Sequence, residues 1–172
     1  MNIQEVILVD AEDRELGSME KMEAHRLGVL HRAFSVFVIN DAGQMLLQRR
    51  ALSKYHSPGL WTNACCSHPS PGENLLDAAT PRLQEEMGFQ CPLATINSFT
   101  YKTHFDNSLT EHEFDHVILG IYNGEVLPDP SEVAEFKWVA IPDLEEDVIL
   151  NGDQYTFWFH IAYPLIRSRL KV

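Results

Sequence analysis

The sequence predicts an α/β (α+β) fold in which a mixed β-sheet lies between helices. Short apolar segments of strand-like composition stand on both sides of one strongly periodic helical segment, and a second amphipathic segment closes the chain. At 172 residues, 45% of them hydrophobic, the chain is most simply a single domain covering 1–172 with a substantial buried core.

The predicted strands are short segments rich in Val, Ile and Phe, bounded by turn-forming residues. In chain order they cover 6–9, 33–40, 44–49, 60–62, 114–122 and 135–141. Residues 10–13 turn the chain after the first strand. Asp41, Ala42 and Gly43 form a turn between the second and third, which predicts a hairpin. Ser57, Pro58 and Gly59 form the loop before the short fourth strand.

Two helices are predicted. Residues 74–87 place apolar side chains at helical spacing, and Gly88 supplies a stop signal. Pro81 lies inside this helix and is expected to kink or split it. Residues 155–170 form a terminal amphipathic helix that ends in Arg and Lys, as the helix dipole prefers.

Composition and charge exclude several classes of function. The net charge of −12 argues against general binding of nucleic acid or of a membrane surface, which requires basic patches. The sequence contains no run of 18 uncharged apolar residues, so no membrane span is predicted. Residues 1–9 are too short and acidic for a signal peptide. Cys65, Cys66 and Cys91 do not make a disulfide framework, so a reducing, cytoplasmic location is expected.

One group of residues has the composition of a site for a divalent metal. Its members are His25, His31, His68, Glu111 and Glu113. The two glutamates are two positions apart, so on a strand they point to the same face. Taken singly, a histidine is more often structural than a ligand, and a carboxylate pair on a strand is more often solvated.

The segment from Ser67 to Phe89 resembles a degenerate Nudix box. That motif is Gly, five residues, Glu, seven residues, then Arg-Glu-U-X-Glu-Glu-X-Gly-U with U aliphatic, and it gathers carboxylates that hold Mg²⁺ against a diphosphate. Here Ser67 replaces the first Gly, Pro81 replaces Arg, and Arg82 replaces a Glu that hydrolases use. Losing a carboxylate and adding a cation favours binding of a diphosphate over hydrolysis.

Further motifs are similar to those of the type 1 isopentenyl-diphosphate isomerase family, a branch of the Nudix proteins. The resemblance spans roughly 21–158. Its most specific part is Trp61-Thr62-Asn63, followed by Cys66, His68 and Pro69, which a generic Nudix hydrolase lacks. The segments 30–35, 48–54 and 111–113 match as well.

This resemblance implies a Nudix-like sheet between helices and specific residue roles. The implied ligands of one divalent metal, Mn²⁺, Mg²⁺ or Zn²⁺, are His25, His31, His68, Glu111 and Glu113. Glu86 is expected to help bind a Mg²⁺ completed by the substrate diphosphate. The expected diphosphate contacts are Lys21, Arg50, Lys54 and Arg82. The expected catalytic groups are Cys66, Glu113, Tyr101 and Trp158, the last facing a carbocation.

Three functions remain open from the sequence. The first is isomerisation of isopentenyl diphosphate to dimethylallyl diphosphate, the second is Nudix pyrophosphohydrolase activity, and the third is an inactive relative that binds metal or diphosphate. The expected partner is a small diphosphate rather than nucleic acid or a membrane. The oligomeric state is not set by the sequence, and a monomer is the default expectation.

Overall fold

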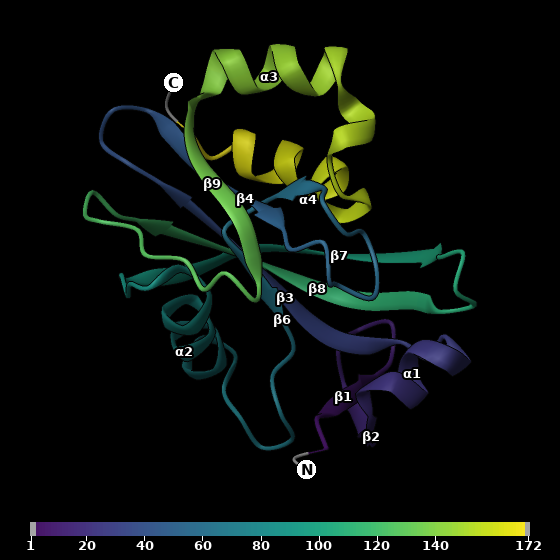
Figure 1. The fold of residues 1–172 in the computed structure, drawn as a ribbon. Coiled ribbons are helices and arrows are strands. Elements are labelled where there is room, and N and C mark those ends of the chain that lie inside the picture. The colour runs from purple at the N-terminus through teal and green to yellow at the C-terminus, as the bar shows by residue number, and fades with distance from the viewer. Residues whose placement is uncertain (1–2, 171–172) are drawn as a thin grey trace.

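A computed structural model describes residues 3–170. The strands join in one mixed sheet with helices on both faces, which confirms the predicted fold class (Figure 1). The strands are β1 (Glu5–Val9), β2 (Glu15–Glu20), β3 (His31–Ile39), β4 (Gln44–Arg50), β5 (Trp61–Thr62), β6 (Cys65–Ser67), β7 (Leu93–His104), β8 (Thr110–Ile121) and β9 (Val133–Ala140). The helices are α1 (Lys21–Leu27), α2 (Leu75–Met87), α3 (Ile141–Leu150) and α4 (Phe157–Arg167), with a 3₁₀ turn η1 (Gly152–Gln154).

Strand β3 is the centre of the sheet. It pairs in parallel with β8 along its whole length, and antiparallel with β6 and β1 on its other edge. Because both edges of β3 are occupied, β4 pairs with β3 only at Ile39–Met45. The rest of β4 pairs with β9 and β5. The predicted hairpin therefore exists only at its tip.

Alternation along β3 builds two hydrophobic cores. Phe34, Val36 and Val38 pack toward α2, whereas Phe37 packs into a second core that contains Phe159 of α4. Helices α3 and α4 lie together on this second face, opposite α2 (Figure 1). A sheet buried on both faces explains why its central strands are nearly all apolar.

Helix α2 is found one residue shorter than the predicted 74–87, and it ends at the predicted Gly88. The side chain of Asn74 accepts a hydrogen bond from the Leu76 amide at 3.0 Å, and Gly88 ends the helix with a φ of 78°. Pro81 does not split the helix, which is continuous from 75 to 87. Its ring lies on the exposed face, and burial of the Ala79 and Leu83 face holds the helix together despite the missing amide.

Several elements have no clear signal in the sequence. They are β2, α1, β6, β7 and α3. The polar strand β7 forms because it pairs with β8 along its length, a long-range interaction that local composition does not report. The final helix was predicted for 155–170 and is found from Phe157 to Arg167. Lys171, the lysine expected near its end, lies outside the described residues. Within residues 3–170, no helix combines the length and apolar character needed to cross a membrane.

Candidate active site

Three acidic side chains alternate along β8 and share one face of the sheet. Glu111, Glu113 and Asp115 are 3%, 6% and 1% exposed, so all three are buried. The predicted placement of the two glutamates on one face of a strand is confirmed, and Asp115 extends the row. The neighbouring strands place His31 of β3 and Tyr101 of β7 directly beside Glu113.

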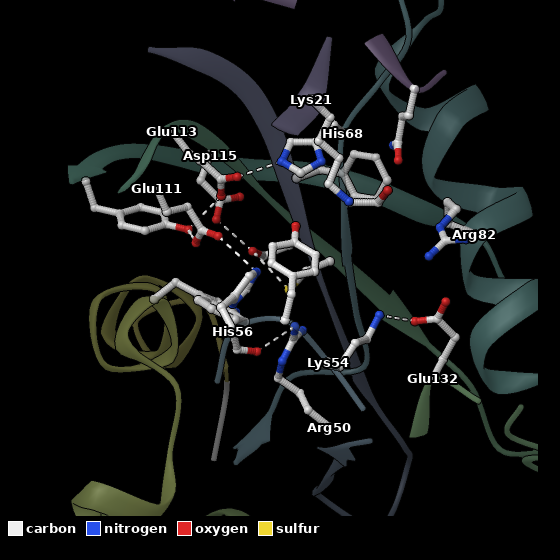
Figure 2. A pocket seen from close by; sticks show the side chains of 18 residues that line it. Lys21, Arg50, Lys54, His56, His68, Arg82, Glu111, Glu113, Asp115 and Glu132 are labelled. Atoms are coloured by element: carbon white, nitrogen blue, oxygen red, sulfur yellow. Dashed lines mark hydrogen bonds and ion pairs between the residues drawn. The ribbon is translucent and has the colours of Figure 1, made fainter. Parts of the chain in front are cut away.

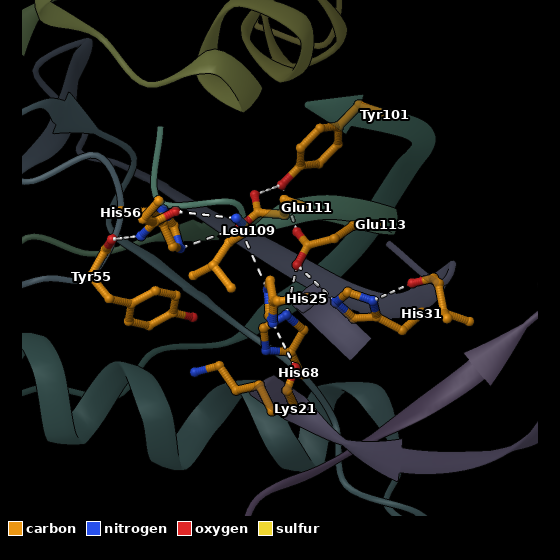
Figure 3. Close-up of polar contacts among 12 residues, drawn as sticks. Lys21, His25, His31, Tyr55, His56, His68, Tyr101, Leu109, Glu111 and Glu113 are labelled. Atoms are coloured by element: carbon orange, nitrogen blue, oxygen red, sulfur yellow. Dashed lines mark hydrogen bonds and ion pairs between the residues drawn. The ribbon is translucent and has the colours of Figure 1, made fainter. Parts of the chain in front are cut away.

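Three histidines from separate elements surround Glu113 (Figure 3). His25 comes from α1, His31 begins β3, and His68 follows β6. The Nε2 atoms of His31 and His68 lie 3.2 and 2.6 Å from Oε2 of Glu113. One ligand atom from each histidine and one oxygen of Glu113 all lie within 4.8 Å of one another. Four of the five predicted ligands of this site therefore converge.

The chain between α1 and β3 brings His25 and His31 together. Gly28 ends α1 in the left-handed conformation with a φ of 68°, and the chain turns directly into β3. A Cβ at Gly28 would also lie 3.2 Å from Cγ2 of Thr110 on β8, so the turn is packed closely against that strand. The ring centroids of His25 and His31 consequently lie 5.2 Å apart.

These residues fit a divalent cation. The Nδ1 atoms of His25 and His31 bond to the carbonyls of Lys21 and Val29 at 2.7 and 2.9 Å, so each ring directs its Nε2 toward Glu113 or the space beside it. Nε2 of His25 is buried and has no hydrogen-bond partner among residues 3–170. An orphaned imidazole nitrogen beside a carboxylate is the donor arrangement that a metal of borderline hardness satisfies.

Electrostatics favour the same protonation states that a metal requires. Burial lowers the pKa of His25 and lowers that of His68 to about 4, which keeps both rings neutral at pH 7. Burial by itself opposes the charge of Glu113, but His68 and His31 outweigh it and hold the pKa of this carboxyl well below its usual range. The cluster thus offers the neutral imidazoles of His25 and His68 and a carboxylate.

Glu111 lies beside this cluster and is held by other groups. Its Oε2 is 3.9 Å from Nε2 of His25, and the Tyr101 hydroxyl donates to its Oε1. The same hydroxyl lies 2.6 Å from Oε1 of Glu113, so Tyr101 bridges the two carboxyls. Burial and the charge of Glu113 raise the pKa of Glu111 well above its usual value, and burial with both glutamates raises that of Tyr101. Glu111 and Tyr101 therefore tend to keep their protons.

His56 is a site residue without any sequence signal. It is 8% exposed, and its Nε2 lies 3.2 Å from Oε2 of Glu111. Its ring stacks on Phe105 at 4.9 Å and meets Trp158 edge-on at 5.8 Å. Burial lowers its pKa to about 3. Loop residues reach the site through tertiary packing, so no spacing rule identifies this histidine.

Cys66 lies on β6 with its sulfur held by polar groups. The Asn63 amide donates to Sγ at 3.2 Å, and Oγ of Ser35 lies 3.5 Å from Sγ. Burial, followed by the nearby carboxyl of Asp115, raises the pKa of the Cys66 thiol, so the sulfur carries its proton at neutral pH. Trp158 donates from Nε1 to the same Asn63 side chain at 3.2 Å, which links the indole to the thiol.

Three cations line the side of the pocket opposite the acidic side chains of β8 (Figure 2). They are Lys21, Lys54 and Arg82. Burial and the charges of Lys54 and Arg82 lower the pKa of Lys21, which shows that the three cations are close enough to repel one another. Lys54 pairs with Glu132, and Arg82 lies 2.7 Å from Glu85. A cluster of partly buried cations is stabilised by an anionic ligand.

Arg50 and Glu86 have different positions relative to this cluster. Arg50 is only 9% exposed and lies 5.4 Å from the Trp158 ring, at the edge of the pocket beside His56. Glu86 is 3.5 Å from Arg82 and accepts from the Cys65 thiol at 2.8 Å. It is not among the residues that line the pocket, and burial raises its pKa.

The pocket has a volume of about 300 Å³. It is lined by all the residues predicted to act on protons or the carbocation, Cys66, Tyr101, Glu113 and Trp158. It is also lined by all four predicted diphosphate contacts, Lys21, Arg50, Lys54 and Arg82. Of the predicted metal ligands, His68, Glu111 and Glu113 reach its wall, whereas His25 and His31 lie behind it.

Comparison with known proteins decides the family. The NUDIX domain matches residues 29–159. The chain is 51% identical over 157 residues to isopentenyl-diphosphate Delta-isomerase of Burkholderia multivorans, covering 91% of this chain and 89% of that protein. It is 48% identical over 154 residues to the protein of the same name in Serratia proteamaculans, with 90% and 86% covered. The chain belongs to the isopentenyl-diphosphate Delta-isomerase family of the Nudix superfamily. The resemblance seen in the sequence is thereby confirmed.

Solved structures support the Nudix fold. The DR0079 protein of Deinococcus radiodurans aligns with a TM-score of 0.71 at 19% identity, covering 86% of this chain and 90% of that one. A MutT Nudix hydrolase from Burkholderia pseudomallei aligns with a TM-score of 0.64 at 19% identity, covering 80% and 98%. At this identity the likeness concerns the fold, and membership of the isomerase family rests on the relatives of 48–51% identity.

The family motifs account for most of the pocket but not for all of it. Ser35, Tyr55, His56 and Asp115 also line it. Ser35 lies inside a matched segment, although no role was predicted for it. Asp115 is the next alternate residue after Glu113, so the period of a strand was a usable signal for it. Tyr55 and His56 sit in a loop, where no such period applies.

Proposed function

We propose that this chain converts isopentenyl diphosphate to dimethylallyl diphosphate by a 1,3-allylic proton rearrangement, a step of isoprenoid biosynthesis. The observation that carries the proposal is the convergence of Cys66 and the Tyr101–Glu113 pair with four cations on one pocket of about 300 Å³. Names of the family members support the same reaction, because the matched relatives are isopentenyl-diphosphate Delta-isomerases.

The reaction needs an acid and a base that reach the same small alkene. Addition of a proton to the terminal carbon gives a tertiary carbocation, and loss of a proton from C2 forms the new double bond. Cys66 and Glu113 with Tyr101 are the groups we assign to these two transfers, one proton being delivered and one removed. The thiol and phenol are both protonated at neutral pH, and Glu113 is ionised, so donors and an acceptor are all available.

Trp158 is the group we assign to stabilisation of the cation. Its ring lines the pocket and is oriented by the hydrogen bond from Nε1 to Asn63. An indole face stabilises a desolvated cation by about 2 kcal/mol. Because the indole is 3% exposed, water has little access to this wall, which protects the carbocation from addition of water.

The diphosphate is the handle by which the substrate is oriented. We assign its binding to Lys21, Arg50, Lys54 and Arg82. Binding energy from this charged group holds the alkene against the proton-transfer groups, although the cations do not take part in the proton transfers. The role of Glu86 in a Mg²⁺ site completed by the diphosphate stays a prediction, since Glu86 is not among the residues that line the pocket.

We assign a divalent metal to His25, His31, His68 and Glu113, with Glu111 as the fifth ligand, and we propose that activity depends on it. When bound, such an ion fixes and polarises its carboxylate ligands. The residues themselves supply the rest: the two carbonyl-bonded histidines are oriented before any ion binds, and Tyr101 connects both carboxyls. Mn²⁺, Zn²⁺ and Mg²⁺ all suit a mixed nitrogen and oxygen donor set to different degrees.

Proton NMR of isopentenyl diphosphate in heavy water with the purified protein and Mg²⁺ tests the reaction. Dimethylallyl diphosphate with deuterium at the methyl and C2 positions is the expected product. Release of phosphate or pyrophosphate from an unchanged alkene would indicate a hydrolase instead. Binding of metal and diphosphate with no change in the alkene would indicate an inactive relative.

Four further predictions concern the location, domain count, oligomeric state and partners of the enzyme. All three cysteines are unpaired, which supports a reducing, cytoplasmic location. The strands of residues 3–170 belong to one sheet, which supports a single domain. The monomeric state stays a prediction, as does the absence of nucleic-acid or membrane partners.

A further inference from the structure

Asp115 is a buried carboxyl in the pocket that the proposed reaction does not use. It is 1% exposed and lines the cavity beside Cys66. Its Oδ2 accepts a hydrogen bond from the Ser35 hydroxyl at 2.7 Å, while its Oδ1 has no partner among the described residues. Burying a carboxyl with one neutral partner is costly, so stability does not explain its presence.

The Ser35 hydroxyl connects Asp115 to Cys66. Ser35 on β3 and Cys66 on β6 are directly opposite each other in the antiparallel register. A serine hydroxyl has a single proton and two lone pairs. Because that proton goes to Asp115, the lone pairs of Ser35 are free to accept the thiol hydrogen of Cys66 across 3.5 Å.

The competing acceptor for the thiol hydrogen is already occupied. Oδ1 of Asn63 lies 3.4 Å from Sγ of Cys66. The same oxygen accepts from Thr62 Oγ1 at 2.8 Å and from Trp158 Nε1 at 3.2 Å, which uses both of its lone pairs. Meanwhile Nδ2 of Asn63 donates to the sulfur. The thiol hydrogen therefore points to Ser35, and the sulfur is fixed from two sides.

We infer that Asp115 is a positioning residue, which orients the Cys66 thiol through the Ser35 hydroxyl. This inference rests on the proposed role of Cys66 in proton transfer. Without an acceptor at 115, the Ser35 hydroxyl is free to rotate and to donate to the sulfur, so the thiol hydrogen loses its single acceptor and the Cys66 thiol loses its fixed orientation in the pocket. Loss of orientation lowers the rate of proton transfer without changing the groups that bind the diphosphate.

Steady-state kinetics of four variants test the connection. Asp115→Leu keeps the branching and the number of side-chain heavy atoms and removes the acceptor. Ser35→Ala removes the bridge, and Asp115→Asn keeps an acceptor oxygen without the charge. We expect kcat to fall roughly tenfold in D115L and in S35A, the size of one lost hydrogen bond, with KM nearly unchanged. The D115L/S35A double variant should be no slower than either single variant, and D115N should recover most of the rate lost in D115L.

A second measurement does not depend on turnover. Iodoacetamide labels the three cysteines, and mass spectrometry of peptides compares their rates within one sample. With Asp115 removed, the freed Ser35 hydroxyl stabilises the thiolate, so the ratio of labelling at Cys66 to labelling at Cys91 should rise severalfold in D115L but not in S35A. Cys65 is fully buried and reports local opening, so its labelling should stay slow in every variant.

The outcomes separate the inference from the proposed function. Full kcat in D115L with an unchanged Cys66 ratio would overturn the inference, as would additive losses in the double variant or a D115N variant as slow as D115L. Fast labelling of Cys65 in D115L would assign the effect to loss of structure and would also overturn it. If the wild-type protein shows no isomerisation at all, the proposed function fails, yet the labelling ratios still decide whether Asp115 controls the thiol.

Discussion

His31 and Glu113 lie opposite each other on the parallel strands β3 and β8, with Nε2 of the histidine 3.2 Å from Oε2 of the glutamate. This single register pair connects the sheet to the chemistry of the pocket. A shift of β8 by one residue would turn Glu111, Glu113 and Asp115 into the opposite face. The ladder that stabilises the centre of the sheet therefore also sets the geometry of the metal cluster.

Replacing the thiol of Cys66 should abolish most of the catalytic activity and leave the fold intact. We expect Cys66→Ala to lower kcat by a factor on the order of 10² to 10⁴, because a positioned acid or base is lost. Cys91→Ala is the matched control, since Cys91 does not line the pocket. Both variants should bind a diphosphate analogue like the wild type in calorimetry. Normal turnover in C66A would remove Cys66 from the mechanism.

Replacing the carboxylate at the centre of the histidine cluster should weaken metal binding. Glu113→Gln retains the size of the side chain but removes the negative charge that two histidines contact. We expect at least a tenfold loss of Mn²⁺ or Zn²⁺ affinity by titration calorimetry, together with loss of turnover. The exposed Glu125→Gln variant should match the wild type in both. Unchanged affinity in E113Q would show that the cluster is not the metal site.

Substitution of the adjacent residues Arg49 and Arg50 distinguishes a contact with the substrate from a general effect of surface charge. Arg50 lines the pocket, whereas Arg49 points the other way toward Glu135, 3.6 Å distant. We expect Arg50→Gln to raise KM for isopentenyl diphosphate by about 10- to 100-fold, the range for a lost charge-assisted contact to phosphate. Arg49→Gln should leave KM within about twofold, because exposed ion pairs contribute little. Equal effects from the two would contradict the assignment of Arg50.

Acid should destabilise the metal-free protein through its buried histidines. Burial lowers the pKa of His56 to about 3 and of His68 to about 4, below the usual value of about 6.5. The unfolded chain therefore takes up protons first as the pH falls from about 6.5 toward 4, so the free energy of unfolding decreases across that range. Urea denaturation in EDTA at pH 7 and pH 5 measures this, and His56→Phe should flatten the dependence. An equal pH dependence in H56F would exclude His56 as a contributor.

Pro81 should be a site where stability is gained. Its ring removes one amide from the interior of α2, and its side chain is exposed rather than packed. We expect Pro81→Ala to raise the free energy of unfolding by about 1 to 3 kcal/mol, as the helix regains a hydrogen bond. Thermal unfolding of P81A and of the neighbouring exposed variant Gln84→Ala compares the proline effect with that of an ordinary surface change. A lower melting temperature in P81A would show that Pro81 supports the helix bend or start.

The sequence by itself determined the fold class, the bounds of α2 and most of the central strands, because these depend on local periodicity, caps and turns. Its motifs also named the residues of the pocket, including Cys66 and Glu113. Only the tertiary structure decided that β7 pairs with β8, that β4 leaves β3 for β9, and that Tyr55 and His56 join the site. The physical reason is that pairing between strands distant in sequence, and the seating of loop side chains in a cavity, are stabilised by long-range contacts that leave no periodic trace in the chain.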